Sequence, residues 1–113
     1  MFRVAIIGGE ASEDYVKFRN KCISCLKEKV KTDHIMILSP GDRYIDAFSE
    51  RFKIDVKTFI VDWKKYGKDA LKARAEEMLS QSDAVIVFDL GKKETNIYKK
   101  MASEKGIPLR VIL

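Results

Sequence analysis

The stretch Arg3-Val4-Ala5-Ile6-Ile7-Gly8-Gly9 sets the fold, because it has the pattern of a short strand that ends in two glycines. Its apolar residues follow one another without alternation, which is typical of a strand covered on both faces of a parallel sheet. Four further runs share this character and are rich in Val, Ile and Phe, at residues 34–38, 56–61, 84–88 and 109–113. We therefore expect five buried strands, the first at residues 3–8.

Each interval between these runs has helical periodicity. Ser12 is the expected N-cap of a first helix of about five turns. This helix would bury residues at spacings of three and four: Tyr15, Phe18, Cys22, Cys25, Leu26 and Val30. A second helix is expected to open at Asp42, a third to cover residues 68–81, and a fourth to follow Thr95 and end at Gly106.

Strict alternation of strands and helices with short connections predicts one α/β domain over residues 1–113. We expect a three-layer, Rossmann-like fold with five parallel strands in the order 3-2-1-4-5. Ligands of such sheets bind outside the carboxyl ends of the strands, at the switch point where the winding reverses. The loops that follow the strands are therefore the first place to search for a site.

Composition narrows the class of protein. Apolar residues make up 46% of the 113 residues and charged residues 35%, which excludes a disordered chain. No apolar run approaches the roughly 18–20 residues of a membrane span, and the opening residues are expected to form a strand rather than a signal peptide. Two cysteines, three residues apart, indicate a reducing, cytoplasmic setting without disulfides.

Metal and nucleic-acid sites are not expected. Cys22 and Cys25 lie in the middle of a predicted helix, where core packing is the simplest role, and His34 is the only histidine that could join them. We predict neither a metal nor a cofactor. The net charge is +5, but no basic stripe is interleaved with aromatic residues, so nucleic acid is not the expected partner.

The loops after the first four strands combine glycines with charge. Glycine lets a backbone approach a ligand closely, and each following helix offers free N–H groups to an anion. These four loops, together with Arg43 after the second loop, hold six basic and five acidic residues. The basic residues are Arg43, Lys64, Lys65, Lys68, Lys92 and Lys93. This combination favours a small phosphate-bearing ligand. We expect the principal pocket to be lined by Gly8, Gly9, Ser39, Gly41, Gly91 and Thr95.

Several motifs resemble one protein family. They are Ile6-Ile7-Gly8-Gly9, Ser39-Pro40-Gly41-Asp42, Asp62-Trp63-Lys64-Lys65-Tyr66-Gly67-Lys68, Ala73-Arg74-Ala75-Glu76-Glu77-Met78-Leu79 before the fourth strand, and Gly106-Ile107-Pro108. Together they resemble the YspA/YpsA-related branch of the SLOG superfamily of Rossmann-like domains. The resemblance implies a nucleotide or nucleotide-derived ligand. The chain departs from the family pattern at Pro40, Asp42 and Tyr44, and it has one glycine fewer in the loop that contains Gly91.

Twelve residues are candidates for nucleotide binding: Gly8, Gly9, Ser39, Pro40, Gly41, Asp42, Asp46, Arg74, Gly91, Lys92, Lys93 and Thr95. Three of them have alternative roles. Asp42 is either a helix N-cap or a ligand contact, and Asp46 matches the family's aspartate, which implies a contact to a ribose hydroxyl. Arg74 is either a phosphate clamp or a packing residue with a buried stem.

Three functions stay open at this point. The first is a module that binds a nucleotide as a sensor, sequestering or defence-related protein. The second is an enzyme that cleaves N-glycosidic bonds, such as a nucleotide phosphoribohydrolase or a nucleoside deoxyribosyltransferase, with Glu10 and Glu94 as the catalytic carboxylates. The third is a structural protein with a decayed site, able to form a homo-oligomer. Trp63 and Tyr66 could stack on a base. Alternatively, they cover the end of the sheet or form a dimer contact.

Overall fold

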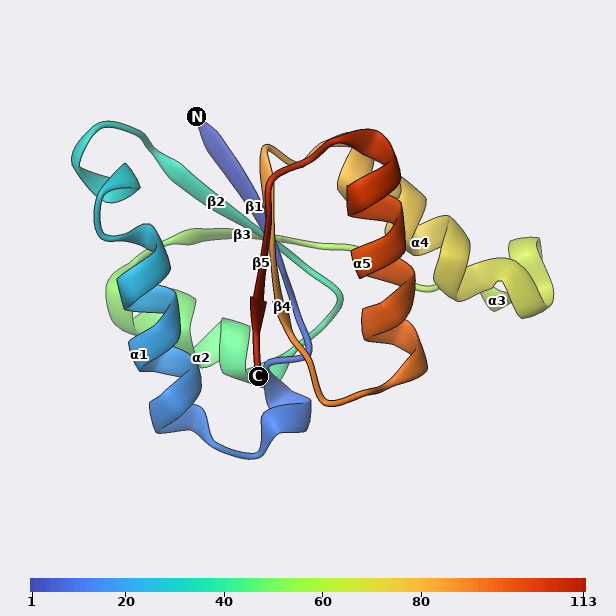
Figure 1. The fold of residues 1–113 in the computed structure, drawn as a ribbon, viewed down its shortest axis with the longest axis horizontal. Helices are drawn as coiled ribbons and strands as arrows, with labels where there is room; N and C mark the ends of the chain where they lie inside the picture. Colours follow the sequence, from blue (N-terminus) through green and yellow to red (C-terminus); the bar gives the residue numbers. More distant parts are fainter.

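A parallel sheet of five strands forms the middle layer of the molecule (Figure 1). The structure is a computed structural model that describes residues 1–113. The strands are β1 (Phe2–Ile7), β2 (Ile35–Ser39), β3 (Asp55–Thr58), β4 (Ala84–Phe88) and β5 (Leu109–Ile112). Their order in the sheet is β3-β2-β1-β4-β5, and every pair is parallel. The predicted α/β class and strand order are thus confirmed.

Helices cover both faces of this sheet. The helices are α1 (Tyr15–Leu26), α2 (Arg43–Phe52), α3 (Trp63–Tyr66), α4 (Ala70–Ser80) and α5 (Lys93–Lys105). Single 3-10 turns lie at η1 (Glu10–Ser12), η2 (Lys29–Lys31) and η3 (Gly67–Asp69). Figure 1 shows α1 and α2 on one side of the sheet, α4 and α5 on the other, and α3 beyond α4. None of these helices is long and apolar enough to cross a membrane.

The two faces of β1 belong to two separate cores. Val4 and Ile6 pack in one core with Phe18 of α1, whereas Ala5 and Ile7 pack in the other with helices α4 and α5. Successive side chains of a strand point to opposite faces, so a strand buried on both faces needs an unbroken apolar run. The register pairs β1 with β2 on one side and β4 on the other, which places it at the switch point.

The predicted boundaries of two helices were wrong. The side chain of Asp14, not Ser12, caps α1 by accepting a hydrogen bond from the amide of Lys17 at 3.0 Å. Helix α1 ends at Leu26, so Val30 lies outside it, in η2, and is exposed. Helix α5 begins at Lys93, before Thr95, because its first turn follows directly on the loop after β4.

The edge strands also differ from the prediction of strands buried on both faces. In β3 only Val56 is partly covered, and in β5 only Ile112 is buried. An edge strand has one neighbour, and charged side chains on it discourage pairing with another chain. The third strand also stops at Thr58, and the apolar residues that follow it run on into the segment that leads to α3.

Candidate functional site

A cavity of about 500 Å³ opens at the carboxyl ends of β1, β2 and β4, and we call it the switch-point cavity. Its walls come from the loop after β1, the loop after β2, the start of α5 and one residue of α4. Nine sequence-predicted site residues line it: Gly8, Glu10, Pro40, Gly41, Asp42, Arg74, Lys92, Glu94 and Thr95. The fold therefore brings together most of the residues that were proposed from the sequence.

Five other predicted residues do not line this cavity. Gly9 is turned inward, because a Cβ there would meet the ring of Phe18. Ser39 is fully buried. The other three, Asp46, Gly91 and Lys93, are exposed on loops or on the first turns of helices. Of the six residues expected to line the pocket, three do so: Gly8, Gly41 and Thr95. The other three, Gly9, Ser39 and Gly91, do not.

Gly8, directly after β1, lies close to the end of β4. Its φ is +82°, a left-handed conformation that favours glycine. A Cβ built there would overlap the carbonyl oxygen of Phe88 at the end of β4 and lie 3.3 Å from Cγ2 of Thr95. Thr95 is itself buried, and its hydroxyl donates to the carbonyl of Lys92 at 2.7 Å. The floor of the cavity is therefore tightly packed.

Asp42 acts as the N-cap of α2. Its Oδ1 accepts from the amide of Tyr44 at 2.8 Å, and its Oδ2 accepts from the amide of Glu10 at 2.9 Å. The Ser39 hydroxyl in turn accepts from the amides of Gly41 at 3.0 Å and Asp42 at 3.3 Å. These bonds join the loops after β1 and β2. They also engage backbone donors that a phosphate would otherwise use.

The carboxylate of Glu10 occupies the amino end of α2. It accepts from the backbone amide of Arg43 at 3.1 Å and from Nε of the same residue at 2.7 Å. These bonds to the amide and then to the side chain of Arg43 lower the pKa of Glu10 below its ordinary value. An internal anion therefore sits where a helix start would attract the phosphate of a ligand.

Arg74 connects two loops from within the protein. It belongs to α4, is only 9% exposed, and donates through Nη1 to the carbonyl oxygen of Pro40 at 3.0 Å. Its Nη2 forms an ion pair with Glu94 on the first turn of α5. The third nitrogen of the guanidinium, Nε, is buried without a hydrogen-bond partner. An unsatisfied buried donor costs about 1–3 kcal/mol and calls for an explanation in terms of strain or function.

The charges around the switch-point cavity nearly balance. Basic residues were expected to outnumber acidic ones, but the lining has four acidic and three basic residues: Glu10, Glu13, Asp42 and Glu94 against Arg43, Arg74 and Lys92. Lys64 and Lys65 line a different cavity, while Lys68 and Lys93 line neither. The arginines are therefore held by internal carboxylates rather than left as a free basic patch.

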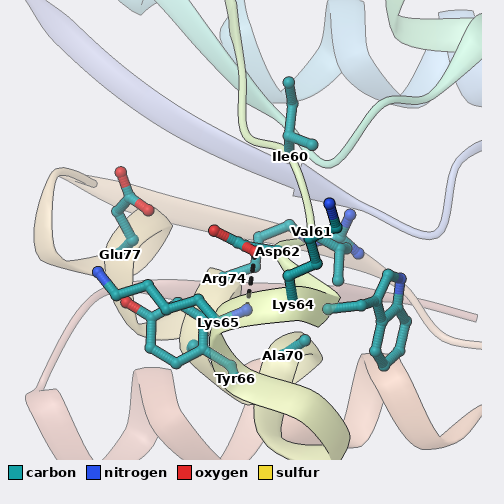
Figure 2. A pocket seen from close by; sticks show the side chains of 11 residues that line it. Ile60, Val61, Asp62, Lys64, Lys65, Tyr66, Ala70, Arg74 and Glu77 are labelled. Carbon is teal, nitrogen blue, oxygen red and sulfur yellow. Dashed lines mark hydrogen bonds between the residues drawn. The ribbon is translucent and has the colours of Figure 1, made fainter.

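A second cavity of about 600 Å³ lies between α3 and α4, and we call it the aromatic cavity (Figure 2). Trp63 and Tyr66 of α3 line it together with Ala70 and Arg74 of α4. Asp62 caps α3 by accepting from the amide of Lys65 at 3.0 Å, the bond drawn dashed in Figure 2. Sequence analysis noted the two aromatic residues but did not predict that they border a cavity beside Arg74.

The remaining titratable residues form no metal cluster. No group of three or more His, Cys, Asp or Glu side chains lies close enough to hold a metal ion. Cys22 is buried in the core, as its helical position predicted, and Cys25 is partly buried beside it. Burial is the main cause that raises the pKa of the Cys22 thiol, which makes the thiolate scarce.

Comparison with known proteins gives no family for this chain. No protein-family model matches it, and no curated protein matches it.

Proposed function

We propose that this protein binds a nucleotide or nucleotide-derived ligand, with a phosphate group in the switch-point cavity. One observation carries the proposal: Arg74 is a nearly buried guanidinium on the cavity wall with one unsatisfied donor. A core residue that only packed its stem would keep its charged head in water. The resemblance of the motifs to the SLOG superfamily points to the same class of ligand.

A phosphate in this cavity has several donors to replace its water. Arg74 can form two parallel bonds to phosphate oxygens once its partner Glu94, which is 37% exposed, turns towards solvent. The amide of Arg43 at the start of α2 becomes a further donor when Glu10 leaves it. Lys92 borders the same cavity and adds a positive charge. The site therefore accepts a phosphate by releasing two internal carboxylates.

Titration calorimetry with adenosine, guanosine, cytidine and uridine monophosphates and with inorganic phosphate tests this proposal. The variant Arg74→Met removes the guanidinium and keeps an apolar stem, and it should bind the best of these ligands at least tenfold more weakly, about 1.4 kcal/mol. Lys72→Met is the matched control, because Lys72 is an exposed residue of the same helix that lines neither cavity.

Two outcomes would contradict the proposal. Equal affinity in the wild type and in Arg74→Met would show that Arg74 only packs and bridges loops. Absence of binding for every compound in the set would favour the third possibility, a structural protein whose site has decayed.

A second candidate function is cleavage of an N-glycosidic bond, and it is favoured by the placement of Glu10 and Glu94 on the same cavity. Such a reaction needs one carboxylate to attack or stabilise the sugar carbon and a second group to transfer the proton. Glu10, whose pKa is lowered, supplies an ionised carboxylate for the first role. Release of free base from the four monophosphates, abolished in Glu10→Gln and in Glu94→Gln, would establish the enzyme; binding without release would establish the module.

A further inference from the structure

We infer that the nucleotide ligand lies across both cavities, with its base in the aromatic cavity and its phosphate in the switch-point cavity. This inference rests on the proposed function and assigns the second half of the ligand. The decisive feature is Arg74, the residue that lines both cavities. Both cavities share this side chain as part of their lining, so a ligand held by its guanidinium is adjacent to the aromatic cavity.

The aromatic cavity offers the surface that a base requires. Trp63 is 57% exposed and Tyr66 is 43% exposed, although large aromatic side chains are normally covered by neighbours. Ile60, on the segment that leads into α3, is 85% exposed and lines the same cavity. Three large apolar side chains thus stand open to water around one hollow. Their apolar surface becomes covered when a planar ring stacks there.

Hydrogen bonds hold the backbone of α3 that carries the two aromatic side chains. The Asp62 side chain caps α3, and the backbone carbonyl oxygen of Asp62 accepts a hydrogen bond from the amide of Tyr66 at 3.1 Å. Gly67 follows with a φ of +54°, which turns the chain into η3 and α4. Ala70 and Ala73 of α4 also line the cavity and contribute only methyl groups. These short side chains beside the aromatic residues of α3 leave space that a base can occupy.

The helix start at the switch-point cavity fits the same orientation. The amino end of α2 and the residues Arg43 and Lys92 lie on the switch-point cavity and away from the aromatic one. The phosphate therefore belongs at the switch point. Exposed Lys64 and Lys65 sit at the rim of the aromatic cavity, where they keep its edge polar. A ligand in the reverse orientation would place its base among the charged side chains of the switch-point cavity and away from Trp63 and Tyr66.

Trp63 makes the inference directly measurable, because it is the only tryptophan of the chain. A nucleoside monophosphate that binds by calorimetry should quench its fluorescence by stacking. Ribose 5-phosphate has the same phosphate and sugar without a base. It should bind at least tenfold more weakly and leave the fluorescence unchanged. Base stacking on aromatic side chains is sensitive to alanine substitution.

Variants separate stacking from other causes of quenching. Trp63→Ala should lower the affinity for the monophosphate about tenfold and leave the affinity for ribose 5-phosphate unchanged. Trp63→Phe keeps an aromatic ring and should restore most of the lost affinity. The matched control is Phe52→Ala, because Phe52 is an aromatic residue of α2, 42% exposed, that borders neither cavity.

The outcomes distinguish this inference from the proposed function. Equal affinities for the monophosphate and ribose 5-phosphate, with constant fluorescence, would overturn the placement of the base and leave phosphate binding standing. A base-dependent gain that survives in Trp63→Ala would likewise overturn it, because the base would then lie elsewhere. If neither ribose 5-phosphate nor any of the four monophosphates binds, the proposed function is wrong and this inference falls with it.

Discussion

Replacing Gly8 by alanine, with Gly91→Ala as its partner variant, tests how closely β1 and β4 approach at the switch point. Both glycines have a left-handed backbone, with φ values of +82° and +74°. Their surroundings differ. A Cβ at Gly8 would lie closer than 3.0 Å to the carbonyl oxygen of Phe88, whereas a Cβ at Gly91 would meet nothing within 4 Å.

The structure sets the size of the two effects. An alanine in the left-handed region costs roughly 1–2 kcal/mol in either variant, and the gain from a stiffer unfolded chain, about 0.4–1 kcal/mol, is also shared. Only Gly8→Ala adds steric overlap with the backbone of a buried strand, which cannot rotate away. Overpacking of this kind costs about 1–3 kcal/mol. The difference between the two variants therefore isolates the approach of the strands.

Urea unfolding followed by circular dichroism measures this difference. Gly8→Ala should lose about 1–3 kcal/mol more of its free energy of unfolding than Gly91→Ala, provided the two variants unfold with the same dependence on urea. Equal losses would refute the close packing of Gly8 against β4.

Three further predictions follow from groups whose pKa is shifted. The pKa of Glu10 is lowered, so its contribution to the free energy of unfolding is present above its ordinary pKa of 4.5. That contribution is lost as the pH falls through the lower pKa of the folded state. Glu10→Gln should therefore flatten the acid side of a plot of melting temperature against pH. Burial raises the pKa of Tyr98 from 10.0 to about 12, so stability should fall as the pH rises through this range, and Tyr98→Phe should not show this fall. In the native protein a thiol reagent should modify Cys25 but not Cys22, whose buried thiol has a raised pKa; equal rates at the two cysteines would contradict the packing of α1.

The strand order followed from the sequence because the alternation of apolar runs and helical periods leaves few topologies open. Gly8 and Asp42 were placed at the site because each follows the end of a strand, and Arg74 because it lies in a motif that resembles the family. Gly9 and Ser39 were misplaced for a physical reason. Neighbouring residues in a turn point in different directions, and a sequence pattern locates the turn without fixing those directions.

Other parts of the site lay beyond pattern reasoning. The ion pair of Glu10 with Arg43 joins residues 33 positions apart, so counting the charges of the loops could not show that they neutralise one another. Helix α3 has only four residues, fewer than periodicity can detect. The aromatic cavity arises from the way this short helix turns against α4, which only the folded chain reveals.

The carboxylate of Glu10 at the amino end of α2 has a consequence for selectivity. In the proposed function, a phosphate at this position would exchange one anion for another, and the gain in Coulomb energy would be the difference between the two. A ligand with a single negative charge and two oxygens, such as acetate, gains almost nothing over the resident carboxylate. A phosphate monoester carries a second charge and a third oxygen, so it would be favoured over a monocarboxylate in the exchange. The resident carboxylate of Glu10 would thereby select dianions over singly charged carboxylates.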